Sequence, residues 1–143
     1  MAPPRAETAL RILLVEDDLF DANAFGRLVR RSGVSAHVEH HRSVESAWTR
    51  IRISEGAWGL LVLDQHLPDA HGLELLARLR RVDEALPVVV RSTALSRRES
   101  ALASRLGVEA CLEKNDARAD HTLALLLWKI AERAATGVFP RPG

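Results

Sequence analysis

The chain has 143 residues, of which 47% are hydrophobic, which is enough for one domain with a buried core and too short for two ordinary ones. Its formal net charge is only +1 and its Lys and Arg residues are scattered, so direct nucleic-acid binding is not expected. No stretch approaches the roughly 18 apolar residues of a membrane span, and a single cysteine excludes an internal disulfide framework, so we expect a cytoplasmic protein.

Short apolar runs typical of strands alternate five times with amphipathic stretches typical of helices. The predicted strands cover 11–15, 36–40, 59–64, 87–92 and 109–113. The predicted helices cover 19–31, 44–55, 72–81, 97–106 and 117–135. Gly33, Gly107 and Gly137 are each placed to end a helix. Because residues 1–9 and 137–143 are rich in Pro, Gly or small residues, we expect one domain over 10–136 between two tails.

This alternation predicts an α/β fold with a doubly wound parallel sheet. Three of the strands are continuously apolar at their centres, as parallel strands covered on both faces should be. Crossover helices connect parallel strands, and right-handed crossovers place helices on both faces of the sheet. We therefore expect five parallel strands flanked by five helices, with ligands bound beyond the carboxyl ends of the strands.

Acidic residues follow two of these strands. Glu16, Asp17 and Asp18 come after the first strand, and Asp64 comes at the end of the third. Carboxylates a few ångströms apart repel one another unless a cation lies among them, and oxygen ligands suit Mg²⁺. Taken alone, the first cluster is more often a helix cap than a metal site, and we expect the capping role for Asp18. Together, the two clusters predict a magnesium site for phosphate chemistry.

Four segments in order resemble the receiver domains of two-component response regulators, over about 11–135. They read ILLVEDD at 12–18, LDQHLPDAHG at 63–72, PVVVRSTA at 87–94 and GVEACLEK at 107–114. The resemblance implies a flavodoxin-like sheet with strand order 2-1-3-4-5. It also implies that Asp64 accepts a phosphoryl group from a sensor histidine kinase or a phosphotransfer protein.

The resemblance implies further roles at this site. Glu16 and Asp17 would hold Mg²⁺ together with Asp64 and the backbone carbonyl of His66. Lys114 would pair with a phosphate oxygen as a point charge.

The resemblance also implies that a residue at the end of the fourth strand senses the phosphoryl group. Ser92 would donate a hydrogen bond to that group and begin a conformational switch, with Thr93 as the second choice.

Several positions depart from the family pattern. Cys111 stands where the family generally carries an aromatic ring, and we expect it to be a small buried residue. Asn115 replaces a proline that follows a cis bond, so a trans bond and a reshaped loop are expected. His66 occupies a position that influences phosphate lifetime in the family. Arg91 would be costly inside the fourth strand if unpaired, so we predict an ion pair with Glu113.

The last helix carries residues outside its buried stripe. Leu125 and Trp128 fall on this second face. If exposed, they predict a contact with a partner or a homodimer through the fourth helix, fifth strand and fifth helix, unless the tail with Phe139 covers them.

The sequence thus predicts a stand-alone response regulator without an output domain, because only seven residues follow the last predicted helix. It would signal to a downstream target protein by altered surface contacts and would not be an enzyme. Segment 16–22 and the last helix are similar to single-domain regulators that serve bacterial phytochromes. One alternative is a receiver-like interaction module that is never phosphorylated. Another is a phosphatase with an aspartyl-phosphate intermediate, which would want a second aspartate where His66 stands.

Overall fold

A computed structural model describes residues 9–54 and 56–136. Strands and helices alternate along the chain, as the sequence pattern predicts. The strands are β1 (Leu10–Val15), β2 (Ala36–His41), β3 (Leu60–Leu63), β4 (Val88–Ser92) and β5 (Ala110–Glu113). The helices are α1 (Leu19–Ser32), α2 (Val44–Ile53), α3 (Gly72–Arg80), α4 (Arg97–Arg105) and α5 (Ala117–Thr136).

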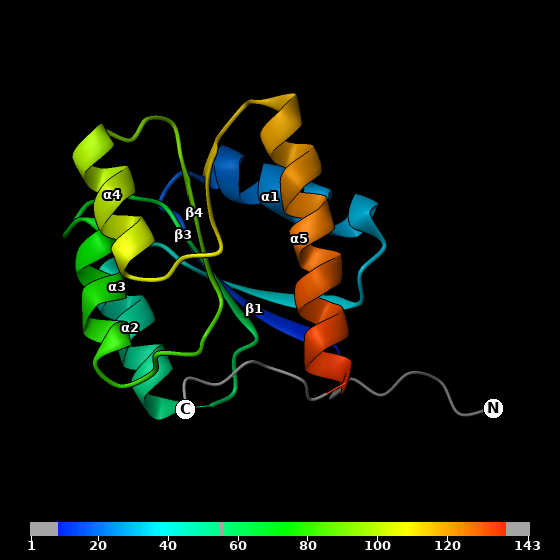
Figure 1. Ribbon diagram of the computed structural model, residues 1–143, viewed down its shortest axis with the longest axis horizontal. Helices are drawn as coiled ribbons and strands as arrows, with labels where there is room; N and C mark the ends of the chain where they lie inside the picture. Colours follow the sequence, from blue (N-terminus) through cyan, green and yellow to red (C-terminus); the bar gives the residue numbers. More distant parts are fainter. Residues whose placement is uncertain (1–8, 55, 137–143) are drawn as a thin grey trace.

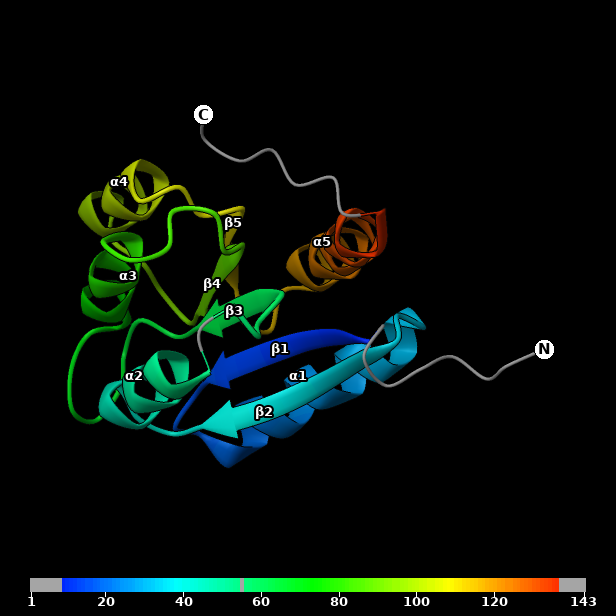
Figure 2. The same cartoon turned by 90° about the horizontal axis from the view of Figure 1, so that it is seen from below.

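The five strands form one parallel sheet in the order β2-β1-β3-β4-β5. Helices α1 and α5 cover one face, and α2, α3 and α4 cover the other (Figures 1 and 2). The predicted doubly wound fold and its strand order are confirmed. In the described part of the chain, none of the helices is long and apolar enough to span a membrane.

The two faces of the sheet bury separate apolar clusters. Helices α2 and α3 pack over Leu61, Leu63 and Val88, whereas α1 and α5 pack over Leu60, Val62 and their neighbours. All four residues of β3 are buried because this strand lies at the centre of the sheet and is covered on both sides. The centre of the sheet is therefore rigidly held, and the residues that follow β3 begin from a fixed position.

The helix boundaries follow local capping chemistry. Asp18 precedes α1, and its side chain accepts a hydrogen bond from the Asp21 amide, as expected for a capping residue. Gly33 ends this helix with φ of 76°, a conformation that costs glycine little. Gly107 follows α4 with φ of 74°. The predicted stop at Gly137 lies outside the described residues, as do the two tails.

The predicted ion pair between Arg91 and Glu113 is wrong. The register pairs Arg91 with Leu112 and Ser92 with Glu113, so the two side chains leave the sheet on opposite faces. No ion pair joins them among the described residues. Arg91 is instead buried on the α1 and α5 face, with its guanidinium carbon 6.0 Å from the Phe25 ring centroid.

Cys111 is exposed, contrary to the expectation of a buried residue. It pairs with Val90 in the register of β5, which is an edge strand. Because β5 has a neighbouring strand on one side only, small size and apolar character do not ensure burial here. Desolvation still raises the pKa of the Cys111 thiol.

Candidate functional site

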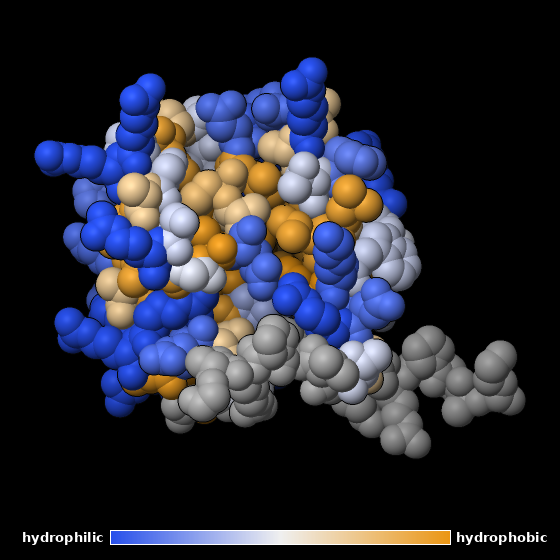
Figure 3. All heavy atoms as spheres, viewed as in Figure 1, coloured by the Kyte–Doolittle hydropathy of each residue, from blue (hydrophilic) through white to orange (hydrophobic). Residues whose placement is uncertain are grey.

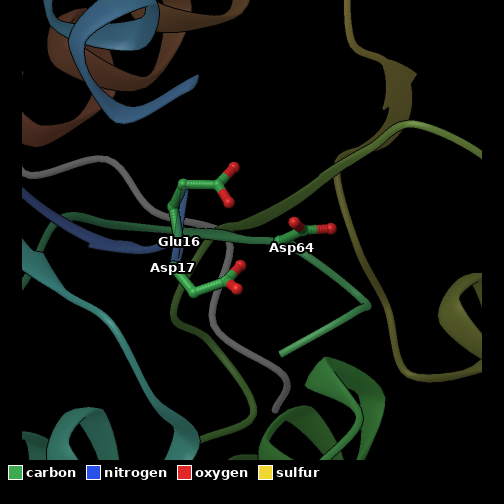
Figure 4. A group of neighbouring side chains, drawn as sticks. All are labelled: Glu16, Asp17 and Asp64. Atoms are coloured by element: carbon green, nitrogen blue, oxygen red, sulfur yellow. The ribbon is translucent and has the colours of Figure 1, made fainter. Parts of the chain in front are cut away.

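The carboxyl edge of the sheet gathers residues from four strands. Glu16 and Asp17 follow β1, and Asp64 follows β3 (Figure 4). Ser92 is the last residue of β4, and Lys114 follows β5. Parallel strands end at one edge of a sheet, which is why segments remote in the sequence converge here.

Lys114 is the centre of this cluster. Its ammonium Nζ lies 2.5 Å from Glu16 Oε1, 2.9 Å from Asp64 Oδ2 and 3.0 Å from Asp21 Oδ2. The lysine is 7% exposed and its carboxylate partners lie at the same edge, so the cation is enclosed by negative charge. Burying a charge is tolerated when it is paired and hydrogen-bonded in this way.

Asp64 is held on both carboxylate oxygens. Ser92 Oγ donates to Oδ1 at 2.9 Å, and the backbone amide of His66 donates to the same atom at 3.3 Å. Lys114 donates to the other oxygen. The Asp64 side chain is therefore fixed in one orientation, and it is 6% exposed.

Gly72 at the start of α3 permits this placement. A Cβ atom at position 72 would lie 2.0 Å from the backbone oxygen of Asp64, so any side chain there would displace the Asp64 backbone. The Gly72 amide also donates to the backbone oxygen of Gln65 at 2.8 Å. The glycine is thus required by close approach of α3 to the segment after β3.

Asp17 completes a group of carboxylates suited to a cation. Ligand atoms of Glu16, Asp17 and Asp64 all lie within 4.8 Å of one another (Figure 4). The donor set consists only of oxygens. Among the described residues, Lys114 forms no ion pair with Asp17, so the Asp17 carboxylate is available to a cation. These features fit a hard divalent cation such as Mg²⁺, as the sequence predicted.

Two carboxyl groups of the pocket, those of Glu16 and Asp64, have pKa values shifted in opposite directions. Burial raises the pKa of Glu16 to about 7, and the negative charge of Asp64 adds to this effect, against the hydrogen bond from Lys114. Burial alone would also raise the pKa of Asp64. The hydrogen bond and the positive charge of Lys114, together with the hydrogen bond from Ser92, outweigh burial and lower this pKa below its usual value. Asp64 is therefore ionised at neutral pH, whereas Glu16 is the group that takes up a proton.

The pKa of Lys114 responds to the same contacts. Burial would lower it, but hydrogen bonds to Asp64, Glu16 and Asp21 outweigh that effect and raise it. The lysine is consequently a permanent cation at this edge of the sheet, available to balance any anion that forms on Asp64.

Two of the residues predicted from the sequence, Thr93 and His66, have exposed side chains. Thr93 is exposed, and in the described chain no hydrogen bond joins it to Asp64, so the structure favours Ser92 for the contact. The His66 side chain is exposed, and its Nε2 atom lies 3.3 Å from the backbone oxygen of Ala94. The role of its backbone carbonyl in metal binding stays a prediction.

Asn115 follows Lys114 with φ of 62°, in the left-handed region. The peptide bonds of the described residues are all trans, which confirms the expectation for the position after Lys114. Asparagine tolerates the left-handed conformation better than most residues. The reshaped loop therefore positions Lys114 without the proline that is usual in the family.

Sequence reasoning missed Asp21 and Gln65. Asp21 lies in the first turn of α1 and reaches back to Lys114, a contact that no spacing in the sequence signals. Gln65 is buried, accepts from the Leu73 amide at 2.8 Å and donates to Glu99 of α4 at 2.7 Å. A polar residue next to Asp64 was visible in the sequence, but its partners were not.

A family model of the response regulator receiver domain matches residues 12–125. The chain belongs to this family. The receiver domain is 30% identical to the methanogenesis regulatory protein FilR1 of Methanothrix harundinacea over 146 aligned positions, which cover 95% of this chain and 32% of FilR1. The chain spans about a third of the length of the curated relatives that it matches first.

Solved structures share the receiver fold. A CheY-like receiver domain from Methanospirillum hungatei superposes with a TM-score of 0.76 at 19% identity, covering 91% of this chain and 99% of that one. The phosphorylated cyanobacterial phytochrome response regulator RcpA superposes with a TM-score of 0.66 at 25% identity, covering 93% and 99%. Two-component signalling is therefore the setting in which the pocket around Asp64 must be interpreted.

Proposed function

We propose that Asp64 accepts a phosphoryl group from a sensor histidine kinase or a phosphotransfer protein, and that the chain signals through altered protein contacts. The observation that carries this proposal is the Asp64 carboxylate, which is ionised and held by Ser92 and Lys114. Phosphoryl transfer demands positioning of the nucleophile and balance of charge more than covalent chemistry from the protein. Asp64 and its neighbours supply both.

In the proposed step an Asp64 oxygen forms a bond to phosphorus while the bond from phosphorus to the donor nitrogen breaks. The electron pair of that bond leaves with the donor imidazole. Lys114 keeps its contact with Asp64 and takes up a phosphoryl oxygen as Glu16 and Asp21 loosen. Ser92 redirects its hydroxyl to another phosphoryl oxygen.

Glu16, Asp17, Asp64 and the His66 carbonyl would hold Mg²⁺ at this site. When bound, the cation neutralises charge on the phosphoryl oxygens. The protein's own part is to keep Asp17 clear of the lysine and to release the proton from Glu16, whose pKa of about 7 makes this release accessible at neutral pH.

The phosphodonor would dock on the start of α1. Leu19 is 54% exposed and Phe20 is 70% exposed, although both are large apolar residues beside the site. Because the two residues are adjacent, they form an apolar patch of the kind that marks an interaction surface. This surface leads directly to Asp21 and Lys114.

The output would pass to the α4, β5 and α5 face. Gln65 links the segment after Asp64 to Glu99 of α4, so a shift of the Asp64 segment reaches that helix. Figure 3 shows apolar side chains gathered between α4 and α5 on this side of the molecule. Leu125 and Trp128 of α5 are about half exposed, but the Trp128 indole donates to the Ser32 backbone oxygen at 2.8 Å and therefore lies towards α1, so only Leu125 is left as a candidate for a target protein or homodimer contact.

The closer assignment to phytochrome signalling rests on resemblance. Segment 16–22 is similar to phytochrome-associated regulators, and RcpA is a phosphorylated phytochrome response regulator. We propose a phytochrome-type histidine kinase as the donor. Transfer from such a kinase, but not from an unrelated one, is the expected result in a phosphotransfer assay.

Incubation with acetyl phosphate and Mg²⁺, followed by intact mass measurement, tests the function. The wild-type protein should gain about 80 Da, the mass of one phosphoryl group. Asp64→Asn should gain none, and Asp69→Asn, which alters an exposed aspartate on the same loop, should behave like wild type. An unmodified wild-type protein would favour the interaction module that is never phosphorylated. Steady turnover of a phosphomonoester would favour an enzyme instead of a signalling domain.

A further inference from the structure

A second cavity lies on the opposite side of β4 from Ser92. It has a volume of about 450 Å³ and opens between α1 and α5, which pack against one another. Phe20, Leu28 and Ala124 form apolar parts of its wall. Ligand pockets generally have volumes of about 300 to 1,000 Å³ and mix apolar walls with a few polar groups. The cavity is therefore large enough for a small organic molecule.

Arg91 contributes the most unusual group in this cavity. The residue is only 7% exposed, yet over residues 9–54 and 56–136 its side chain makes no hydrogen bond or ion pair. The guanidinium carbon instead lies 6.0 Å from the centroid of the Phe25 ring, in a cation–π contact. None of the Arg91 nitrogens is among the fully buried atoms without a partner in the described chain, so the guanidinium reaches the cavity and lacks a counter-ion there, a demand that an anion in the cavity would meet.

The other charged groups around the cavity do not meet this demand. Arg27 and Arg31 line it from α1, and His121 and Asp120 line it from α5. With three guanidinium groups and one carboxylate, the lining carries an excess of two positive charges even when the histidine is neutral. The field inside the cavity therefore favours anions.

We propose that this cavity binds a small organic carboxylate, whose carboxylate pairs with Arg91 and whose apolar body packs against Phe20, Leu28 and Ala124. A guanidinium group offers two parallel N–H donors that match the geometry of a carboxylate. Among the guanidinium groups of the lining only that of Arg91 is buried, whereas Arg27 and Arg31 are exposed, so one carboxylate meets the buried charge and the apolar walls favour an apolar body over a second anionic group. The arrangement thus selects a singly charged ligand with an apolar frame.

The site borders the phosphoacceptor pocket without sharing its residues. Asn115 lines the cavity and directly follows Lys114, and Phe20 lines it and directly precedes Asp21. A bound carboxylate would restrain both segments that hold the Lys114 contacts. Binding itself does not require phosphorylation of Asp64, so the two proposals can fail independently.

Titration of the ¹⁵N-labelled protein with 3-phenylpropionate, followed by amide chemical shifts, tests the site. Saturable shifts are expected for amides of α1, α5 and Asn115. The neutral 3-phenylpropionamide should bind at least about tenfold more weakly, because a charged hydrogen bond contributes about 1.5 to 3 kcal/mol. Equal binding of the amide, or an absence of saturable shifts around the cavity, would overturn the proposal.

Variants assign the effect to the arginines. Arg91→Met should weaken binding of 3-phenylpropionate at least about tenfold, and the exposed Arg31→Met should weaken it about two- to fivefold. Arg97→Met on α4 is the matched control and should bind like wild type. Wild-type affinity in a folded Arg91→Met protein would contradict the proposal. If that variant does not fold, unchanged affinity in Arg31→Met together with equal binding of the amide would do so.

Discussion

Lys114 and Arg91 are both buried cations near the carboxyl ends of neighbouring strands, and each is 7% exposed. Their surroundings differ sharply. Lys114 has carboxylates of Glu16, Asp21 and Asp64 within 3.0 Å, whereas Arg91 has no ion pair in the described chain. The Lys114 ammonium is thus fully paired before any ligand arrives, whereas the Arg91 guanidinium in the cavity between α1 and α5 is not.

This difference suggests two ways in which a buried cation serves function. In the first pocket, carboxylates already occupy the lysine, so an incoming phosphoryl group must displace some of them, and the displacement can be passed on as movement. In the cavity, an anion would meet a group that has no competing partner and would bind without displacing anything. The first arrangement suits a switch, and the second suits a binding site.

Lys114→Met should have the largest effect on stability. It leaves the buried Glu16 and Asp64 without their counter-charge, and breaking such a cluster costs about 3 to 5 kcal/mol in free energy of unfolding. Urea unfolding in the presence of EDTA measures the loss, with the exposed Lys129→Met as control. Addition of Mg²⁺ should restore part of the stability. A variant as stable as wild type in EDTA would show that the lysine does not balance the pocket.

Glu16→Gln should change how stability depends on pH. The pKa of Glu16 is about 7 in the folded protein and ordinarily 4.5, so between these values the folded state keeps a proton that the unfolded chain has released. Wild-type stability should therefore fall as pH rises from 4.5 to 7, by up to about 3 kcal/mol from this group.

The glutamine variant lacks that loss, so its stability relative to wild type should increase across the same interval. Urea unfolding in EDTA at several pH values measures the difference, with the exposed Glu74→Gln as control. Parallel pH profiles for Glu16→Gln and wild type would contradict a raised pKa at this position.

Arg91→Met should have the smallest effect on stability. Removing an unpaired buried charge relieves its desolvation and loses only the contact with the Phe25 ring, so the variant should remain within about 1 kcal/mol of wild type or exceed it. The free energies of unfolding of Arg91→Met and Lys114→Met should therefore differ most strongly. A loss of more than about 2 kcal/mol on urea unfolding would show that Arg91 stabilises the fold directly.

The fold was predictable because the residues of each strand and helix carry local signals of that structure. The apolar run at Leu60–Leu63 and the helix signals at Asp18 and Gly33 depend only on neighbouring residues. The site residues Asp64 and Lys114 were predictable because they lie at strand ends, where the topology alone brings them together.

Contacts that depend on register or helix phase were not predictable. The Arg91 to Glu113 pair assumed that these two residues lie side by side, but the register pairs Glu113 with Ser92, and a displacement of one residue turns a side chain to the other face. Asp21 reaches Lys114 because the first turn of α1 is directed back over the sheet edge, which no spacing along the chain specifies. The exposure of Cys111 likewise depends on the place of β5 at the edge of the sheet, with a neighbouring strand on one side only.

Chemical localisation of the phosphoryl group tests the central claim most directly. After treatment with acetyl phosphate and Mg²⁺, borohydride reduces an aspartyl phosphate to homoserine, which peptide mass spectrometry can place in the sequence. We predict homoserine in place of Asp64 in the wild-type protein and none in Asp64→Asn. Homoserine at another aspartate, or none at position 64 of a phosphorylated protein, would contradict the assignment of Asp64 as the phosphoacceptor.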